Sequence, residues 1–210
     1  PIQRAIDFSM TSFFTTGGIR GHNEKMLSKF YPRSHNMGIK KVLFNKIGGF
    51  GSLRHGQDIE LSNRIHKSGA KVVLLTDAIV FHRRRTTLIK FFRQVFNWGV
   101  ARINLGKIDA NMLEVIHFAP SFFTIFSFLS ILGLTIYPVI FFPLFILGLM
   151  ALLFISLIGA FKTRSILVML LLYIVIPFQL FGYGLGFIIA FFKRYILNQE
   201  EFTGFQKKYY

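Results

Sequence analysis

Two long stretches without charged residues divide the chain into a polar N-terminal part and an apolar C-terminal part. No Asp, Glu, Lys or Arg occurs in 115–161, and none occurs in 165–192. An apolar run of about 18 or more residues is long enough to cross a lipid bilayer as a helix. The first stretch therefore predicts two spanning helices, 115–137 and 138–161. The second predicts a long apolar helix over 165–192.

The N-terminal part shows shorter patterns, which are typical of a water-facing domain. Apolar positions predict a helix over 40–47, and the glycine pair Gly48-Gly49 gives it a natural C-terminal stop. The spacing in 57–68 predicts a second helix, which Gly69 ends. The β-branched run 71–82 instead predicts two short strands or one bent strand.

The segment 83–107 predicts a basic amphipathic helix. Polar and apolar positions take opposite sides at helical spacing: Lys90, Arg93, Gln94, Asn97 and Asn104 against Leu88, Phe92, Val95, Phe96 and Gly99. A cationic helix with aromatic residues, placed just before spanning segments, is expected to lie in the membrane interface.

Charge is strongly unbalanced, which makes the few acidic residues informative. The chain has 25 Lys+Arg against 9 Asp+Glu, a net charge of +16, and no cysteine. Two of the acids, Asp58 and Glu60, follow Gly56 at the start of the second predicted helix. The helix dipole favours negative charge there, so a purely stabilising role is one interpretation of Asp58. Glu60 lies four residues before Arg64 and is expected to pair with it.

The order of motifs suggests a family. NMGIKKVLFNKIGGF (36–50), GQDIELSNRIHKSGAKVVLL (56–75) and FHRRRTTLIKFFRQVFNWG (81–99) follow one another. This series resembles the C-terminal half of the catalytic domain of family 2 glycosyltransferases, in particular the membrane-anchored, succinoglycan-type enzymes. FGYGLGF (181–187) is similar to a tyrosine–glycine motif in the last membrane segment of that group. The resemblance covers nearly the whole chain.

The resemblance implies a fold and a division into domains. We expect an α/β fragment, the C-terminal half of a GT-A glycosyltransferase domain, followed by an all-α transmembrane region. The expected parts are 1–82 from the GT-A domain, 83–114 as interface helix, 115–192 as transmembrane helices and 193–210 as a basic tail. The nucleotide-binding half, with its D-x-D metal motif, would lie N-terminal to this region. We therefore expect the chain to be a C-terminal fragment that is inactive alone.

The resemblance also implies roles for single residues. The position of Asp58 matches the catalytic base, which takes the proton of the acceptor hydroxyl. Substrate-binding positions are Asn36, Gln57, Arg93, Gln94 and Trp98, with Arg93 and Gln94 near the donor diphosphate. Many synthases of the wider family have Q-x-x-R-W, whereas here Asn97 replaces the arginine. The positive charge would then come from Arg93 or Arg102, and single addition is favoured over processive synthesis.

A divalent metal is the cofactor that the resemblance implies. Mg²⁺ or Mn²⁺ would be bound mostly by the N-terminal half, outside this chain. His82 falls where some related folds place a further metal ligand, although a lone histidine is more often structural.

The resemblance implies an inverting glycosyltransferase that moves a sugar from a nucleotide-sugar to a hydroxyl of a lipid-linked or glycan acceptor. We expect a multi-pass protein of the cell inner or plasma membrane, in contact with its lipids, with the catalytic part cytoplasmic. The alternative is a non-catalytic, basic, membrane-anchored interaction module. Nucleic acid is not an expected partner, because the basic residues border spanning segments, where lipid explains them at least as well.

The third apolar helix raises a question of topology. After an outward crossing by 115–137 and a return by 138–161, a single crossing by 165–192 would place Lys193 and Arg194 outside, against the positive-inside tendency. Pro177 and the glycines of 182–186 offer a break into two half-helices that dip in and return. We favour this returning arrangement over a plain third crossing.

Overall fold

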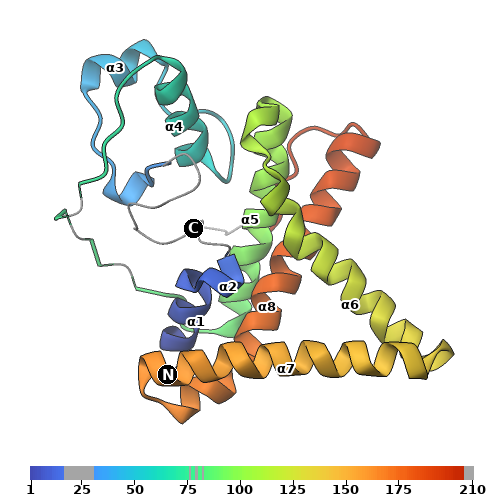
Figure 1. Ribbon diagram of the computed structural model, residues 1–210. Helices are drawn as coiled ribbons and strands as arrows, with labels where there is room; N and C mark the ends of the chain where they lie inside the picture. Colours follow the sequence, from blue (N-terminus) through green and yellow to red (C-terminus); the bar gives the residue numbers. More distant parts are fainter. Residues whose placement is uncertain (17–30, 76, 79, 82, 206–210) are drawn as a thin grey trace.

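The computed structural model describes residues 1–16, 31–75, 77–78, 80–81 and 83–205, and helices form its regular elements (Figure 1). In chain order these are α1 (Ile2–Thr11), α2 (Phe13–Thr16), η1 (Ser34–Asn36), α3 (Lys41–Lys46), α4 (Gln57–Lys67), α5 (Leu88–Ile108), η2 (Ala110–Met112), η3 (Val115–Phe118), α6 (Ala119–Ile136), α7 (Pro138–Thr163), α8 (Ile166–Phe191) and the π-helical turn η4 (Phe192–Ile196).

The expected α/β fold class is wrong, because no strand occurs among the described residues. The β-branched run after α4 is irregular there, and its apolar side chains reach solvent: Val73 is 56% exposed, Leu75 69% and Phe81 96%. A strand must satisfy its backbone groups by pairing with a second strand. No paired strand lies beside this run in the described part of the chain, so its local propensity does not become a sheet.

The short helices of the polar part end where the sequence predicts. α3 stops at Lys46, and Gly48 and Gly49 follow with φ of 81° and 64°. These left-handed conformations are open to glycine without a steric cost from Cβ. α4 is preceded by Gly56, with φ of 86°, and followed by Gly69, with φ of 75°. Glycines therefore set the end of α3 and both ends of α4, the helix that carries Asp58.

α5 and α8 form the centre of the molecule and run side by side (Figure 1). Glycines on both helices allow the two backbones to approach closely. A Cβ placed on Gly99 would lie 2.2 Å from the carbonyl oxygen of Tyr183, and one on Gly186 would lie 2.1 Å from that of Phe96. The pairing continues to the helix ends, where the Lys107 ammonium lies 4.7 Å from the ring centre of Tyr195. The two helices α5 and α8 therefore run in the same direction along this contact.

The FGYGLGF motif is a packing element within an unbroken helix. α8 continues through Pro177, so the predicted break into two half-helices is wrong. Gly182 and Gly186 face α5, while a Cβ on Gly184 would meet the Thr124 side chain of α6. The neighbouring helices occupy the space that these glycines leave, and their packing holds α8 in one piece.

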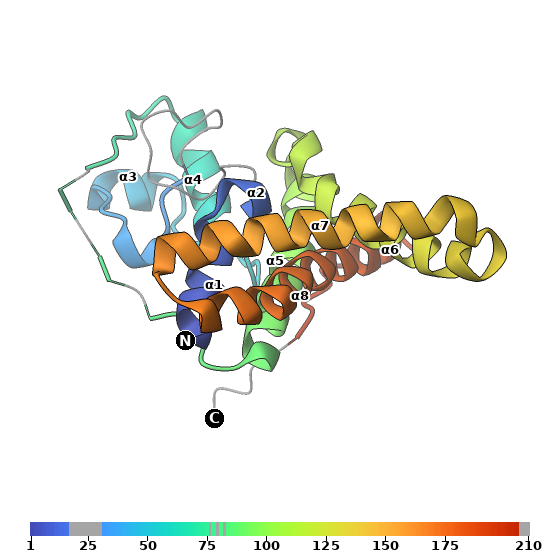
Figure 2. The same cartoon turned by 60° about the horizontal axis from the view of Figure 1, so that its bottom comes forward.

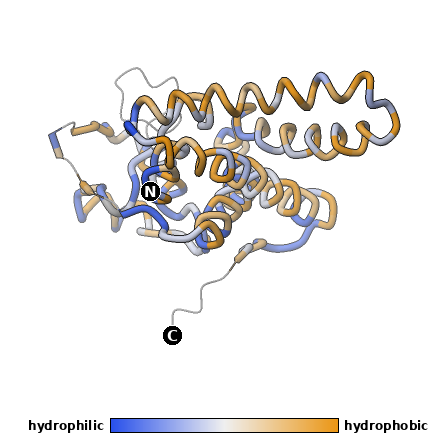
Figure 3. Tube along the Cα trace, turned by 90° about the horizontal axis from the view of Figure 1, so that it is seen from below, coloured by the Kyte–Doolittle hydropathy of each residue, from blue (hydrophilic) through white to orange (hydrophobic). Residues whose placement is uncertain are grey.

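In the part of the chain that the structure describes, three helices are long and apolar enough to cross a membrane: Val115–Ile136, Pro138–Thr163 and Ile166–Ile196. The structure supports the predicted apolar segments as helices. α6 and α7 form a hairpin whose turn lies away from α3 and α4 (Figure 2). Apolar residues continue along both arms of this hairpin (Figure 3).

The chain after η4 folds back along α5. The Asn104 amide donates a hydrogen bond of 2.8 Å to the carbonyl of Phe202. The side chain of Asn97 pairs with the backbone of Phe205 through two hydrogen bonds of 2.9 Å, one in each direction. We call Glu200–Phe205 the C-terminal strap, because it connects the end of the apolar region to the polar part.

Candidate catalytic site

Asp58 lies in the first turn of α4 and presents a carboxylate that is partly open to solvent. Its Oδ1 accepts a hydrogen bond of 2.9 Å from the backbone N–H of Ile59. Its Oδ2 lies 3.9 Å from Nη1 of Arg33. The side chains of Asp58 and Arg33 are 21% and 31% exposed. One carboxylate oxygen is thus held by the backbone, while the other faces a guanidinium and the solvent.

The segment 31–33 brings Arg33 to Asp58. The Ser62 hydroxyl lies within hydrogen-bonding distance of two carbonyl oxygens, at 2.6 Å from that of Asp58 and 3.2 Å from that of Pro32. One helical turn further on, the rings of Tyr31 and His66 meet edge to face at 5.7 Å. Sequence reasoning missed Arg33, because no local spacing rule relates position 33 to position 58. Only the path of the chain along α4 brings them together.

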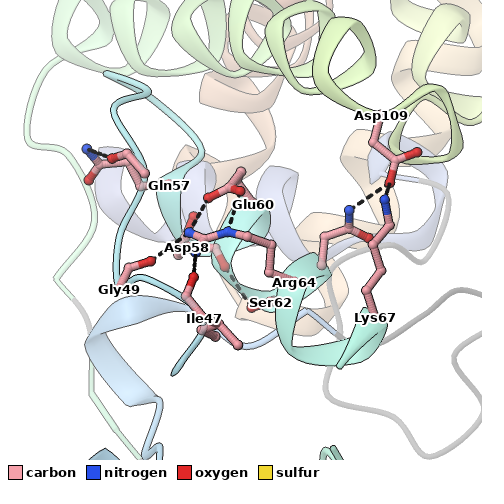
Figure 4. Close-up of polar contacts among 11 residues, drawn as sticks. Ile47, Gly49, Gln57, Asp58, Glu60, Ser62, Arg64, Lys67 and Asp109 are labelled. Atoms are coloured by element: carbon pink, nitrogen blue, oxygen red, sulfur yellow. Dashed lines mark hydrogen bonds and ion pairs between the residues drawn. The ribbon is translucent and has the colours of Figure 1, made fainter. Parts of the chain in front are cut away.

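Arg64 connects α4 to the loop after α3, as Figure 4 shows. Its guanidinium donates to both oxygens of Glu60 at 2.6 and 2.7 Å, which confirms the predicted pair. It also donates to the carbonyl of Gly49 at 2.6 Å and to that of Ile47. The Glu60 carboxylate raises the pKa of Arg64, so the cation is retained. Glu60 therefore serves the scaffold of the site.

The C-terminal half of α4 is fixed to the end of α5 by Asp109 (Figure 4). Its Oδ2 accepts from the Lys67 ammonium at 2.7 Å and from the Asn63 amide at 2.8 Å. These two hydrogen bonds hold the pKa of Asp109 well below its usual value, and a hydrogen bond from the backbone N–H of Asn111 adds a smaller effect in the same direction. The carboxylate stays ionised, and α4 stays in place on α5.

The C-terminal strap fixes the other end of α4. The backbone N–H of Arg54 donates to Glu201 at 2.8 Å, and His55 Nε2 lies 3.0 Å from the carbonyl oxygen of Thr203. Immediately after these residues, a Cβ on Gly56 would lie 3.1 Å from Leu105 of α5. The turn that precedes Asp58 is therefore held between the strap and α5.

The other predicted site residues lie at different places on the surface. Gln57 is exposed beside Asp58, with its amide 3.4 Å from the carbonyl of Gly51. Asn36 is exposed at the end of η1, three residues after Arg33. His82 lies outside the described residues.

The predicted residues on α5 lie toward its N-terminal half. The exposed Arg93 has its guanidinium 5.5 Å from the ring centre of Phe205, on the strap. Gln94 is partly buried, and Trp98 packs against the apolar cluster of α1, α5 and α8. Position 93 precedes Leu105, which packs against Gly56, by about 18 Å along the helix at 1.5 Å per residue.

Arg102 lies nearer to the carboxylate site than Arg93 along α5. Burial lowers the pKa of Arg33; the Asp58 carboxylate opposes this shift, and the positive charge of Arg102 adds to it. The charge of Arg102 thus repels that of Arg33, which faces the Asp58 carboxylate. Such an arrangement suits an anionic ligand, which would relieve the repulsion.

The described side chains do not form a metal site of their own. Among residues 1–16, 31–75, 77–78, 80–81 and 83–205, no group of three or more His, Cys, Asp or Glu could hold a metal ion.

Fold and site together define a helical membrane protein with a carboxylate-and-arginine site on its polar part. A family model described as glycosyl transferase family 21 matches residues 30–199, and the chain belongs to this family. It is also 26% identical, over 101 residues, to the succinoglycan biosynthesis protein ExoA of Rhizobium meliloti (strain 1021). That match covers 48% of this chain and 30% of the relative. No solved structure matches the chain.

These comparisons confirm the predicted resemblance to a glycosyltransferase of the succinoglycan type, with family 21 as the matching family model. The chain spans less than a third of the length of the curated relative.

Proposed function

We propose that this chain is the acceptor side and membrane anchor of an inverting glycosyltransferase. The donor is a nucleotide-sugar, and the acceptor is a hydroxyl of a lipid-linked or growing glycan. Family membership supports the reaction class, and the half-open carboxylate of Asp58 beside Arg33 is the observation that carries the assignment of the site.

Asp58 is the general base of this proposal. The acceptor hydroxyl oxygen attacks the anomeric carbon and transfers its proton to the free carboxylate oxygen. The bond from that carbon to the diphosphate breaks, and the nucleoside diphosphate leaves with the electron pair. A hydroxyl is a poor nucleophile until a positioned base takes its proton. Attack opposite to the leaving group inverts the anomeric centre.

The leaving diphosphate carries developing negative charge that a cation must stabilise. We assign this role to Arg102, with Arg33 beside it, in preference to Arg93. The divalent Mg²⁺ or Mn²⁺ of the proposal would be held mostly by residues outside this chain. The membrane is the cell inner or plasma membrane, and the catalytic part is cytoplasmic, where nucleotide-sugars are made.

The arginine assignment predicts different donor kinetics for two matched variants. In the full-length protein, Arg102→Gln should raise the KM for the nucleotide-sugar by about 10-fold, as expected for the loss of one charge-assisted contact. Arg93→Gln should change it less, because that side chain lies against Phe205. Donor titrations with membranes that contain each variant measure this. A larger increase in KM for Arg93→Gln than for Arg102→Gln would mean that Arg93 contacts the diphosphate.

The reaction class is tested by the stereochemistry of the product. Membranes that contain the full-length protein are incubated with a panel of isotope-labelled nucleotide-sugars and a lipid extract. We expect transfer from one donor, with an anomeric configuration in the product opposite to that in the donor, read by NMR. Retention of configuration would rule out single displacement with Asp58 as base, and absence of transfer from every donor would count against the proposal as a whole.

A further inference from the structure

The two ends of the apolar region meet the same part of the protein. The strap, which follows α8, hydrogen-bonds to Arg54 and His55 before α4 and to Asn97 and Asn104 of α5. All four residues precede the first apolar helix. Residues in direct contact lie on one side of a membrane, so an even number of crossings must separate them. Three apolar helices lie between, so at least one of them does not cross.

α6 and α7 form a helical hairpin that could cross the membrane and return. They are antiparallel arms joined at Tyr137, and near the turn a Cβ on Gly133 would meet the Phe141 ring. At the opposite end, α6 contacts α8 at Gly184, and α7 contacts it where Gly159 faces Leu172. The turn of the hairpin projects away from the polar part in two views (Figures 1 and 2), whereas the C-terminal end of α7 lies beside α1, where the Arg4 guanidinium donates to the carbonyl of Thr163. Each arm is long enough to span the bilayer.

Among the described residues, α8 is accompanied along both of its halves by helices of the polar part, whereas α7 contacts them only in its C-terminal half. Its first half packs on α1 through Ile6, Val168 and Leu172, and the Ser9 hydroxyl donates to Gln179 at 2.9 Å. Its second half packs on α5. These partner helices carry charged residues along their lengths: Arg4 and Asp7 on α1, and Lys90, Arg93, Arg102 and Lys107 on α5.

A crossing by α8 would carry these charges into the hydrocarbon. α5 is about 31 Å long at 1.5 Å per residue, close to the ~30 Å thickness of the hydrocarbon core. An Arg or Lys side chain near the centre of the bilayer is strongly unfavourable. Cations also flank both ends of α8, with Lys162 and Arg164 before it and Lys193 and Arg194 after it. The positive-inside tendency therefore favours the same side for both ends.

We propose that the chain crosses the membrane twice, through α6 and α7, and that α8 lies in the interfacial layer on the side of the catalytic part. The lipid acyl chains contact the outer face of α8, which exposes Ile166, Leu167, Leu170, Ile174 and Ile189 and adjoins α7. Cations on the flanking segments meet the headgroups. The strap then leaves this layer directly for the turn that precedes Asp58.

Cysteine labelling tests the side on which each segment lies, and it does not depend on glycosyl transfer. The chain has no cysteine of its own. Single variants Ser68→Cys, Tyr137→Cys and Glu200→Cys place a thiol after α4, at the hairpin turn and on the strap, all at exposed positions. A membrane-impermeant maleimide is applied to the full-length protein in vesicles of both orientations. Ser68→Cys and Glu200→Cys should react from the same side, and Tyr137→Cys from the other. Reaction of Ser68→Cys and Glu200→Cys from opposite sides would overturn the proposal.

Depth in the bilayer provides a second measurement. Nitroxide labels are placed on Ile174→Cys in α8 and Met150→Cys near the middle of α7, both at exposed positions. Collisions with oxygen and with a water-soluble nickel complex should place Ile174 at the boundary between headgroups and acyl chains, and Met150 near the midplane. Equal depth near the midplane for both labels would show that α8 is a third span.

Discussion

Replacing Asp58 by asparagine in the full-length protein is expected to lower turnover by at least ~10²-fold, the range for loss of a general base. The amide keeps the size of the carboxylate and can still accept the hydrogen bond from Ile59. It cannot take a proton from the acceptor hydroxyl at neutral pH. The donor KM should therefore change little while kcat falls, measured by initial rates with saturating acceptor.

Asp77→Asn is the matched control, because Asp77 is an exposed aspartate outside α4. We expect wild-type turnover from it. Thermal unfolding of Asp58→Asn should also stay close to wild type, which separates a chemical defect from a folding defect. Turnover within a few-fold of wild type for Asp58→Asn would leave Asp58 with the stabilising role that its place at a helix N-terminus also allows.

Adding a single methyl group at Gly186 is expected to separate α5 from α8. In Gly186→Ala the new Cβ would lie 2.1 Å from the carbonyl oxygen of Phe96. Backbone atoms cannot move aside as a side chain can, so the two helices must shift apart. We expect a loss of about 3 kcal/mol or more, at the upper end for overpacked interiors. Thermal unfolding of the detergent-purified protein measures it.

Gly148→Ala is the control for this change. Gly148 also lies in an apolar helix, but nothing lies within 4 Å of a Cβ at this position. Alanine favours the helix over glycine by about 1 kcal/mol in soluble hosts, so this variant should be neutral or slightly more stable. Equal stability of the two variants would mean that the close α5–α8 approach does not hold the molecule together.

Local patterns determined the ends and the character of the helices. Runs without charge specify the apolar helices, because their composition alone decides whether they prefer water or lipid. The glycines at 48, 49 and 69 specify where α3 and α4 end, because left-handed dihedrals favour glycine. The Glu60–Arg64 pair follows from helical spacing alone. The motif order carried the resemblance that the family model confirms.

Tertiary structure decided what depends on residues far apart in the sequence. The run 71–82 has strand propensity, but pairing requires a neighbour that the local sequence cannot supply, and its described residues form no strand. Arg33 reaches Asp58 only because 31–33 lies along α4. The glycines of α8 suggested a break, whereas the structure fills the space beside them with α5 and α6. Hydropathy marks α8 as apolar, but it also packs on α1 and α5, which carry charged residues. The cost of placing these charges in hydrocarbon is the physical reason for our proposal that α8 does not cross the membrane.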